Sequence, residues 1–354
     1  MRILHVITSL ELGGAEKLLT ELLPEQRKLG NEVELLVLDT HGEVFLEKIK
    51  ERGIKVHTTP FDNRNSPKNI FYIGKIVKEG KFDVVHAHLT HAQYWTGFSR
   101  FLDFSKRTYV TTEHSTSNRR RGNRILKEID RIVYGQFDKI ISISPATEFN
   151  LVAWLGEGIE KKSRVIENGI ETEGLEGNVR SAKRSELLMV SRFHPSKDHA
   201  TVIRALEILP KEYTVSFAGD GETMEGCKKL VADMGLGDRV NFLGYCNNVR
   251  ELFKEYDIAI QSSNYEGFGI GALEAMASGL PVVASDVPGL REVVSGGGLL
   301  FRPGDAEDLA SKIRYLEDTE HYRDVSRSGI EKSLEFTIGK TAKRYVDYYR
   351  EEQC

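Results

Sequence analysis

The sequence predicts an α/β protein made of two doubly wound parallel-sheet domains that face each other across a cleft. Short apolar segments alternate with amphipathic segments along nearly the whole chain, as strands and covering helices do in parallel sheets. The alternation stops once, at the polar and aperiodic stretch 171–183, and then starts again. A chain of 354 residues also exceeds what one hydrophobic core usually fills. We therefore expect domains at 1–168 and 169–336, with a C-terminal helix at 337–354 that crosses back to the first domain.

The first half of the chain alternates expected strands with expected helices. After the apolar run at 3–8, for example, leucines recur at helical spacing at positions 18, 19, 22 and 23. The expected strands are 3–8, 32–38, 55–58, 84–88, 108–112 and 139–144. The expected helices are 15–29, 44–52, 70–79, 93–101, 124–136 and one that begins after Pro145.

The second half repeats this pattern. The expected strands are 187–191, 214–218, 240–243, 258–261, 281–284 and 298–301. The expected helices are 199–209, 224–234, 249–255, 271–278, 306–317 and the last stretch 337–351, where Tyr345, Tyr348 and Tyr349 lie near one face. Open parallel sheets bind ligands at the carboxyl ends of their strands, so we expect functional residues in the loops that follow the strands.

Composition argues against several classes of protein. No apolar run approaches the roughly 20 residues that span a bilayer. The segment 1–10 lacks a small-residue cleavage site and is typical of a buried strand rather than of a signal peptide. The three cysteines, Cys227, Cys246 and Cys354, are few and far apart, which disfavours a disulfide framework or a cysteine metal site. These features predict a cytoplasmic protein.

The formal net charge of -4 is unevenly distributed. Residues 1–168 hold 26 basic and 22 acidic side chains, which leaves +4, and the remainder holds 23 and 31, which leaves -8. The basic excess lies between Arg100 and Arg131, with nine basic and four acidic residues. A basic first half can meet an anionic partner such as nucleic acid, phospholipid or pyrophosphate, or it can be ordinary solvated surface.

Three short segments at expected strand ends could hold a phosphate. Gly13 and Gly14 lie between the first strand and the first helix, where paired glycines and free helix N–H groups suit an anion. Arg192 and Lys197 follow a strand and together offer a forked donor and a compact cation, which suits a diphosphate. Gly219 begins a third, glycine-rich strand end. Each segment alone is equally compatible with a tight turn or a solvated loop.

The most informative segment is 264–281, NYEGFGIGALEAMASGLP. It places Glu266 in a glycine-rich loop and Glu274 in the first turns of the following helix, which ends at Gly279 before Pro281. The free N–H groups of that helix form an anion site. Carboxylates there are suited to accepting hydrogen bonds from sugar or ribose hydroxyls. Helix capping by Glu266 alone does not explain the whole segment.

The segment EGFGIGALEAMASGLPVV resembles the signature of two glutamates separated by seven residues in retaining glycosyltransferases with the two-domain GT-B fold, family 4 (glycosyl transferases group 1). Four other segments agree in order, LGGAE, VIENGIE, VSRFHPSKD and AGDGE, so the resemblance covers nearly the whole chain. It implies two Rossmann-like domains and a nucleotide-diphosphate sugar, UDP-linked, held mainly by the second domain. No other cofactor is implied.

The resemblance also implies roles for individual residues. Glu274 would bind the ribose hydroxyls, and Glu266 would contact the transferred sugar, with Phe268, Gly269 and Ile270 offering backbone N–H groups. Arg192 and Lys197 would neutralise the departing diphosphate, and Gly13 and Gly14 would close on it from the first domain. The remaining donor contacts would be His114 near the sugar, Gly219, and Tyr245 at the base pocket.

A metal-free reaction is expected. No Asp-x-Asp pair follows an expected strand, and two cations with several N–H groups can stabilise the leaving diphosphate. The resemblance implies retention of configuration by front-face attack, with Glu266 as a covalent nucleophile the competing mechanism. His86, His88 and His91 mimic a zinc site, but no acidic or cysteine ligand accompanies them, which favours cleft-lining or core histidines.

The basic run Arg119, Arg120, Arg121 and Arg124, with Trp95 among nearby aromatic residues, is expected at the cleft rim of the first domain. Basic and aromatic residues together suit an anionic membrane surface or a lipid-pyrophosphate acceptor. The equally weighted alternative is that the basic residues are the solvated start of a helix and the aromatic residues belong to the hydrophobic core.

The sequence thus predicts a metal-independent hexosyltransferase that acts on a glycan or lipid-linked glycan precursor in cell-surface polysaccharide synthesis. It would be cytoplasmic, with peripheral association at the inner face of the membrane as an added expectation. One alternative is a nucleotide-sugar 2-epimerase on the same fold. Another is a non-catalytic nucleic-acid-binding protein, which the negative net charge and the lack of a recognised binding module disfavour.

Overall fold

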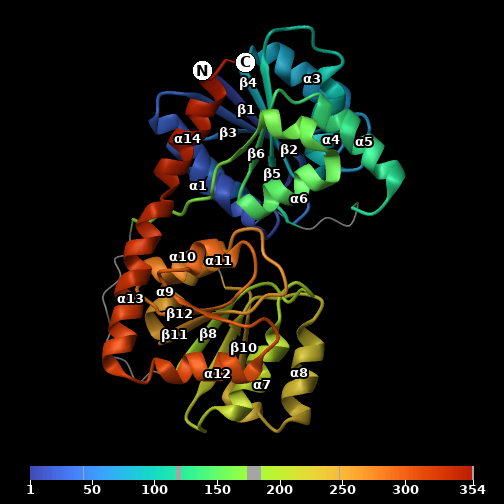
Figure 1. The fold of residues 1–354 in the computed structure, drawn as a ribbon. Coiled ribbons are helices and arrows are strands. Elements are labelled where there is room, and N and C mark those ends of the chain that lie inside the picture. The colour runs from blue at the N-terminus through green and yellow to red at the C-terminus, as the bar shows by residue number, and fades with distance from the viewer. Residues whose placement is uncertain (43, 117–120, 174–184, 247, 353–354) are drawn as a thin grey trace. The chain divides into compact units, whose positions relative to one another are not determined.

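The computed structural model describes residues 1–42, 44–116, 121–173, 185–246 and 248–352 (Figure 1), and the chain forms two compact units. Unit 1 comprises Met1–Glu171 and Ile338–Cys354, and unit 2 comprises Thr172–Thr337. Each unit is built on its own parallel sheet, which confirms the predicted fold class. Most of the stretch 171–183, which we interpreted as a linker, lies outside the described residues.

The sheet of unit 1 has seven strands in the order β3-β2-β1-β4-β5-β6-β7. The chain adds strands outward from β1 in one direction and then returns to the other side of it, so a topological switch point lies between β1 and β4. The strands are β1 (Arg2–Ser9), β2 (Glu32–Asp39), β3 (Lys55–Thr58), β4 (Val84–His88), β5 (Thr108–Glu113), β6 (Lys139–Ser142) and β7 (Ser163–Val165).

Helices cover both faces of this sheet. The helices of unit 1 are α1 (Gly14–Lys28), α2 (Leu46–Glu51), α3 (Asn69–Gly80), α4 (Thr90–Arg100), α5 (Arg124–Gly135), α6 (Pro145–Leu155) and α14 (Ile338–Arg350), with a 3₁₀ turn at Glu157–Lys162. Alternate residues of the central strands point to opposite faces. Ile3 and Ile7 of β1 therefore pack with α1 and α14, whereas Leu4 and Val6 pack in a cluster with residues of α3 and α4.

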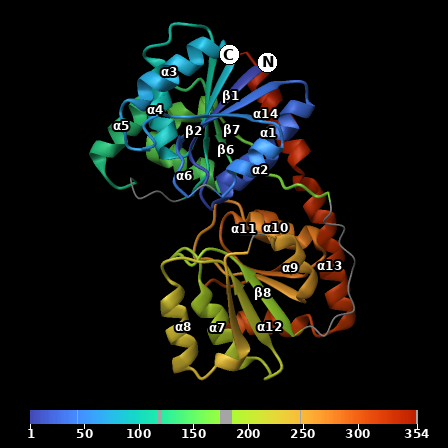
Figure 2. The ribbon, with the colours of Figure 1, turned by 180° about the vertical axis from the view of Figure 1, so that it is seen from behind.

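The C-terminal helix α14 packs beside α1, as both views show (Figures 1 and 2). Tyr345, Tyr348 and Tyr349 are buried against the core of unit 1. The ammonium of Lys139, at the start of β6, donates hydrogen bonds to the carbonyl oxygens of Tyr348 and Tyr349 near the end of the helix. A cation at this end satisfies carbonyls that no helical N–H can reach.

A polar layer lies between the sheet and these two helices. His5 of β1 pairs in register with His86 of β4, and His88 lies two residues further along the same face. All three imidazoles are fully buried. Burial lowers the pKa of His5 to about 4 and holds those of His86 and His88 well below their ordinary value, because the charged form loses its hydration.

The sheet of unit 2 has six parallel strands in the order β10-β9-β8-β11-β12-β13, so its switch point lies between β8 and β11. The strands are β8 (Glu186–Val190), β9 (Thr214–Ala218), β10 (Val240–Gly244), β11 (Ile258–Gln261), β12 (Val282–Ser285) and β13 (Leu299–Phe301). The helices are α7 (His199–Ile208), α8 (Met224–Asp233), α9 (Val249–Glu255), α10 (Ile270–Ala277), α11 (Leu290–Val294), α12 (Ala306–Tyr315) and α13 (Thr319–Ser333). Two 3₁₀ turns lie at Gly237–Arg239 and Leu334–Phe336.

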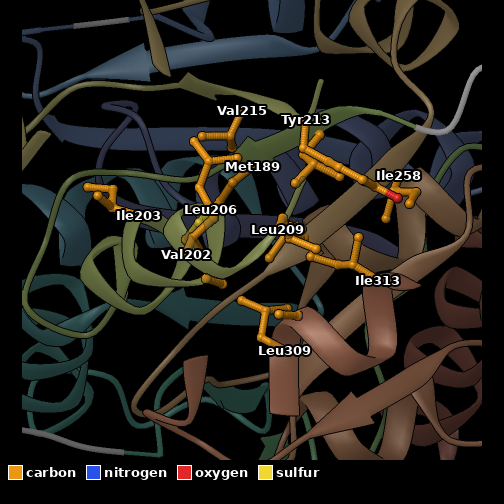
Figure 3. Packing of buried hydrophobic residues seen from close by; sticks show 14 of the residues in the cluster. Met189, Val202, Ile203, Leu206, Leu209, Tyr213, Val215, Ile258, Leu309 and Ile313 are labelled. Carbon is orange, nitrogen blue, oxygen red and sulfur yellow. The ribbon is translucent and has the colours of Figure 1, made fainter. Parts of the chain in front are cut away.

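The core of unit 2 forms where α7 and α12 pack together on the sheet. Figure 3 shows side chains of α7, such as Val202 and Leu206, close to Met189 of β8, with Leu309 and Ile313 of α12 beside Leu209. These residues recur at helical spacing, which is why both helices are predictable from the sequence.

The sequence analysis missed α13, α11 and the short strand β7. The buried positions of α13 are Tyr322, Ser326, Gly329 and Ser333, which have helical spacing but are mostly small or polar. Gly329 allows a close approach here, because a Cβ at this position would lie 3.0 Å from the carbonyl oxygen of Gly297. A close helix contact made through small side chains leaves no apolar periodicity to detect. Within the described residues, every helix is too short or too polar to cross a lipid bilayer.

The buried histidines predict acid lability. A histidine with a lowered pKa in the folded state stays neutral there but is protonated near pH 6.5 when unfolded. Its contribution to stability is therefore present above pH 6.5 and is lost as the pH falls, with a slope that approaches about 1.4 kcal/mol per pH unit for each such ring. We expect the free energy of unfolding in urea to fall steeply between pH 6.5 and 5.5.

The matched variant is His86→Gln, which removes one titrating ring and retains polar atoms at that position. Between pH 6.5 and 5.5 its unfolding free energy should fall less than that of the wild type, by about 1 kcal/mol. A wild-type unfolding free energy that is flat between pH 6.5 and 5.5 would contradict this account.

Candidate active site

The switch point of unit 2 brings two loops together, residues 191–198 after β8 and 262–269 after β11. The backbone N–H of Asp198 donates to the carbonyl of Ser262 at 3.1 Å, and the N–H of Asn264 donates to the carbonyl of Ser196 at 2.9 Å. Lys197 and Ser263 form an antiparallel bridge between these loops. The two loops therefore behave as one rigid element, and their side chains hold fixed relative positions.

Lys197 and Glu266 form an ion pair across this junction. The ammonium of Lys197 contacts Oε2 of Glu266 and also donates to Oγ of Ser263 at 3.3 Å. The backbone N–H of Gly267 donates to the other carboxylate oxygen of Glu266 at 3.1 Å. Both charged side chains are largely shielded, with exposed fractions of 15% and 19%. Low exposure strengthens the attraction and holds the carboxylate in one orientation.

Helix α10 begins immediately after this pair. Gly269 precedes its first residue, Ile270, in a left-handed conformation (φ 93°). The first N–H groups of the helix have no partner within the helix and can donate to an anion. Phe268 instead turns its ring into the core, edge-on to Phe336 at 5.6 Å, so only its backbone can serve a ligand. Glu274 lies one turn into the helix and is only 3% exposed.

Backbone contacts join the ends of β8 and β9. The N–H of Ser191 donates to the carbonyl of Ala218 at 3.0 Å, and the N–H of Phe193 donates to the carbonyl of Asp220 at 2.9 Å. Gly219 and Gly221 have φ values of 149° and 147°, and a Cβ on either would lie within 2.4 Å of a carbonyl oxygen in the β8 loop. Glycine is required at both positions, and the close contact holds the segment that carries Arg192.

Arg192 and Tyr245 are the exposed members of the predicted set. Arg192 is exposed, and within the described chain its guanidinium makes no ion pair. Tyr245 is 43% exposed after the end of β10, two strands away from β8 in the sheet order. The structure thus brings Lys197, Glu266 and the start of α10 into contact, and leaves Tyr245 apart from them.

In unit 1, Gly13 and Gly14 lie at the start of α1, as the sequence predicts for a strand-to-helix turn. The carboxylate of Glu16 folds back against Gly13, where a Cβ would lie only 2.1 Å from Oε2. Glu16 is 8% exposed. A buried carboxylate in the first turn complements the positive end of the helix, a role that the sequence analysis did not assign to Glu16.

His114 follows β5 and lies partly exposed at the carboxyl edge of the unit 1 sheet. Its Nε2 is 3.1 Å from Nδ1 of the buried His88. Burial lowers the pKa of His114, so the ring is neutral at physiological pH. Both nitrogens of His5, His86 and His88 also have hydrogen-bond partners, which is the arrangement of satisfied core histidines.

The predicted basic rim is only partly described, because Arg119 and Arg120 lie outside the described residues. Arg121 turns inward: its guanidinium donates to the carbonyl of Thr116 at 2.7 Å and lies 4.0 Å from the carboxylate of Glu113. Arg124 is exposed at the first position of α5. Trp95 is partly buried, and its indole N–H donates to the backbone carbonyl of Arg64 at 2.7 Å.

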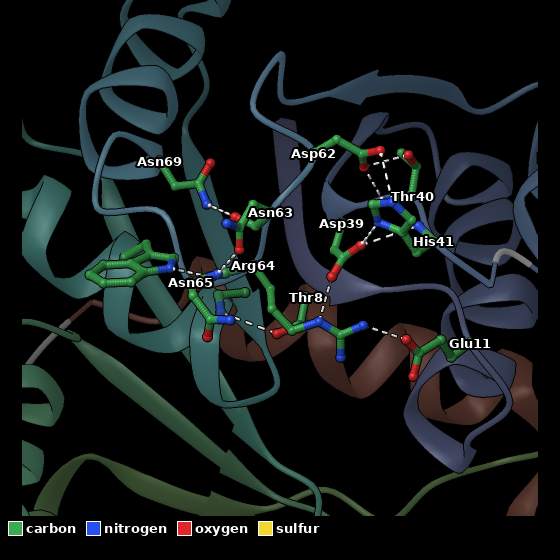
Figure 4. A network of polar contacts seen from close by, with 12 residues as sticks. Thr8, Glu11, Asp39, Thr40, His41, Asp62, Asn63, Arg64, Asn65 and Asn69 are labelled. Carbon is green, nitrogen blue, oxygen red and sulfur yellow. Dashed lines mark hydrogen bonds and ion pairs between the residues drawn. The ribbon is translucent and has the colours of Figure 1, made fainter.

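A polar network at the carboxyl ends of β1 and β2 had no signal in the sequence analysis (Figure 4). The guanidinium of Arg64 bridges Asp39 and Glu11, and His41 binds the same Asp39 carboxylate at 2.8 Å. Burial would raise the pKa of Asp39, but hydrogen bonds from Arg64 and His41 lower it below its ordinary value. The members of this network come from the end of β2 and from the loops after β1, β2 and β3, so their proximity depends on the strand order.

Two family models match the chain. The model described as Glycosyltransferase Family 4 matches residues 12–173, and the model described as Glycosyl transferases group 1 matches residues 173–332. Among curated proteins, an O-antigen biosynthesis glycosyltransferase of Escherichia coli, WbnH, is 27% identical over 351 residues, which is 96% of each chain.

Solved structures of similar fold cover the chain almost completely. HepE of Anabaena in complex with UDP superposes with a TM-score of 0.84 at 22% identity, over 98% of this chain and 99% of that one. A sucrose-phosphate synthase of Thermosynechococcus elongatus gives a TM-score of 0.84 at 22% identity, over 99% and 98%. These likenesses establish the two-sheet fold.

We expect Gly221→Ala to destabilise unit 2. The new methyl group would lie 2.4 Å from the carbonyl oxygen of Phe193, and the backbone would be strained at φ 147°. Overpacking of this kind costs about 1–3 kcal/mol, measurable as a shift of the urea unfolding midpoint. The control is Gly226→Ala in α8, where a Cβ meets open space and should stabilise by about 0.4–1 kcal/mol. Equal stabilities for the two variants would refute the close-approach explanation.

Proposed function

This chain belongs to the glycosyltransferases of group 1, family 4, and from that membership we propose that it transfers a hexose from a nucleotide-diphosphate sugar to a hydroxyl of a glycan or lipid-linked glycan precursor. One observation carries the proposal: the Lys197–Glu266 ion pair lies at the switch point of unit 2, directly before the N-terminus of α10. Cation, carboxylate and helix N–H groups at one sheet edge suit a ligand that joins a diphosphate to a polyhydroxylated sugar.

The diphosphate would be neutralised by two cations and by backbone donors. Arg192 is exposed and offers a forked donor, and Lys197 supplies a second charge fixed by its contact with Glu266. The first N–H groups of α10 add preorganised donors. Charge grows on the diphosphate as the bond to the sugar breaks, so these groups stabilise the transition state more than the bound substrate.

We propose catalysis without a divalent metal, which the same residues support. A metal ion in such a reaction would neutralise the leaving diphosphate. Arg192, Lys197 and the start of α10 can supply that neutralisation from the protein itself.

The state of Glu266 favours retention of configuration by front-face attack over a covalent intermediate. Its carboxylate is bound to the Lys197 ammonium and accepts a hydrogen bond from the N–H of Gly267. Both interactions withdraw electron density from the oxygens and weaken them as nucleophiles. An oriented carboxylate remains a good acceptor for a sugar hydroxyl. In the proposed mechanism the leaving phosphate assists deprotonation of the acceptor.

For the rest of the donor we propose a UDP-sugar. Glu274 would accept hydrogen bonds from the ribose hydroxyls, and the exposed Tyr245 would lie beside the base. The structurally similar HepE has been solved with UDP and glucose, which supports the choice of nucleotide. The similarity to WbnH supports a role in surface polysaccharide synthesis.

The test is incubation of the purified protein with a panel of nucleotide sugars and acceptor glycans, with nucleotide release and product mass as readouts. We expect UDP release that survives EDTA. Arg192→Ala should lower kcat by about 10²–10³, the effect of removing one preorganised donor, and Arg192→Lys should recover only part of it.

Glu225→Gln, on the exposed start of α8, is the matched surface control and should leave kcat unchanged. Strict dependence of the chemical step on Mg²⁺ or Mn²⁺ would refute the metal-free mechanism. Interconversion of a UDP-sugar with its 2-epimer, without transfer to any acceptor, would establish the epimerase alternative instead.

We also propose that unit 1 meets an anionic membrane surface. The segment after α4 and the outer side of α5 expose large apolar side chains: Phe101, Leu102, Phe104 (96% exposed), Ile125 (74%) and Ile132 (52%). The exposed cations Arg124 and Arg131 lie on the same helix as the two isoleucines. Apolar anchors beside basic residues suit the headgroup region of a bilayer.

Co-sedimentation with vesicles containing anionic phospholipid tests this surface. We expect binding that declines as salt rises, and loss of most binding in Phe104→Ser/Ile125→Ser. Phe71→Ser, on α3 with the residue 69% exposed, is the matched control and should bind like the wild type. Equal recovery of all three proteins in the supernatant, with full activity on a soluble acceptor, would favour a water-soluble acceptor.

A further inference from the structure

We propose that a buried hydrogen-bond chain starting at Gln26 fixes the tautomer of His114, so that His114 carries its proton on Nε2 and presents an unprotonated Nδ1. His5 and His88 are the intermediate members of this chain. Gln26, His5 and His88 act as positioning residues for His114. The inference rests on the proposed function in one respect, that a donor sugar is bound and that His114 contacts it, as the family resemblance implies. The chain itself is a property of the ligand-free protein and can be tested as such.

The chain is continuous through the core of unit 1. Oε1 of Gln26, on α1, is 2.8 Å from Nε2 of His5. Nδ1 of His5 is 2.9 Å from Nε2 of His88 on the neighbouring strand. Nδ1 of His88 is in turn 3.1 Å from Nε2 of His114, at the end of β5. Gln26, His5 and His88 are fully buried, so water does not compete for the first two of these bonds.

The amide oxygen of Gln26 sets the direction of every bond. An amide oxygen can only accept, so His5 must donate from Nε2. A neutral imidazole has one N–H, so Nδ1 of His5 accepts, and His88 must donate to it from Nε2. Nδ1 of His88 then accepts, and His114 must donate from Nε2. Burial, which lowers the pKa of His5, His88 and His114, keeps the three rings neutral.

In this orientation a second branch pairs the amide nitrogen of Gln26. Its Nε2 donates to the hydroxyl of Tyr349, on α14, at 3.3 Å. That hydroxyl lies 2.6 Å from Nδ1 of His86, and Nε2 of His86 lies 2.8 Å from Oγ1 of Thr112. Rotating the amide by 180° would reverse every bond in both branches. His114 would then present an N–H group at Nδ1, which is the opposite chemistry.

The consequence is selectivity at the sugar. A neutral His114 whose Nδ1 has no proton can accept a hydrogen bond from a hydroxyl, but it cannot donate one and cannot act as an acid. A donor sugar with a hydroxyl at that position is therefore preferred over a deoxy sugar, because the lone pair would otherwise remain unpaired.

The first experiment measures tautomers by nitrogen-15 NMR of histidine-labelled, ligand-free protein at pH 7, with each resonance assigned by its loss in a single histidine substitution. We expect His5, His88 and His114 to carry their proton on Nε2. A proton on Nδ1 of His114, or a cationic ring, would overturn the proposal. This result needs no donor sugar and is independent of the proposed function.

The second experiment removes the first acceptor of the hydrogen-bond chain. Gln26→Leu has no acceptor for His5, so His114 should become a mixture of tautomers. For the donor used most efficiently, kcat/KM should then fall roughly threefold to tenfold, the effect of one neutral hydrogen bond. Gln26→Glu retains an acceptor facing His5 and should restore both the single tautomer and kcat/KM.

Thr112→Val is the matched control, because the bonds that it deletes, to His86 and to the hydroxyl of Tyr345, are not part of the chain from Gln26 to His114. It should retain the wild-type tautomer of His114 and a kcat/KM within twofold of wild type. Loss of the tautomer in Gln26→Leu with unchanged kcat/KM would overturn the positioning role. Absence of transfer by the wild type, with the expected tautomers, would contradict the proposed function and leave the chain supported.

Discussion

Parallel strand pairing is the constraint on which the rest of this protein depends. Every strand of the two sheets runs in the same direction as its neighbours, so the loops that leave the strands gather at one edge of each sheet. In open parallel sheets, ligands bind outside the carboxyl ends of the strands at these switch points. In unit 2 this edge holds Arg192, Lys197, Glu266 and the start of α10. In unit 1 it holds Gly13, Gly14 and His114.

Rigid backbone contacts make those loop residues chemically useful. In unit 2 the loops after β8, β9 and β11 are joined by main-chain hydrogen bonds, and glycine is necessary where the backbones approach most closely. Lys197 and Glu266 are consequently held in contact before any substrate arrives. An ion pair that is already oriented needs little reorganisation energy when charge develops nearby. Electrostatic catalysis requires this property.

The buried polar layer of unit 1 shows how a fold can accept imidazole rings inside its core. Burying an unpaired polar group is costly, but here each ring nitrogen of His5, His86 and His88 has a partner. The partners come from α1, from β5 and from α14, so the C-terminal helix completes the layer. Within the described residues, the ring nitrogens of these three histidines are all used in hydrogen bonds.

The sequence by itself determined the fold class, most of the strands and helices, and the family, because apolar periodicity and the segment 264–281 are local signals. It did not reveal α13, whose buried face is small and polar, or the contact between Lys197 and Glu266, which lie 69 residues apart. Nor did it indicate that Tyr349 binds His86 across 263 residues of chain. Strand order and helix packing decide which distant side chains meet, and periodicity reports only which face of each element is buried.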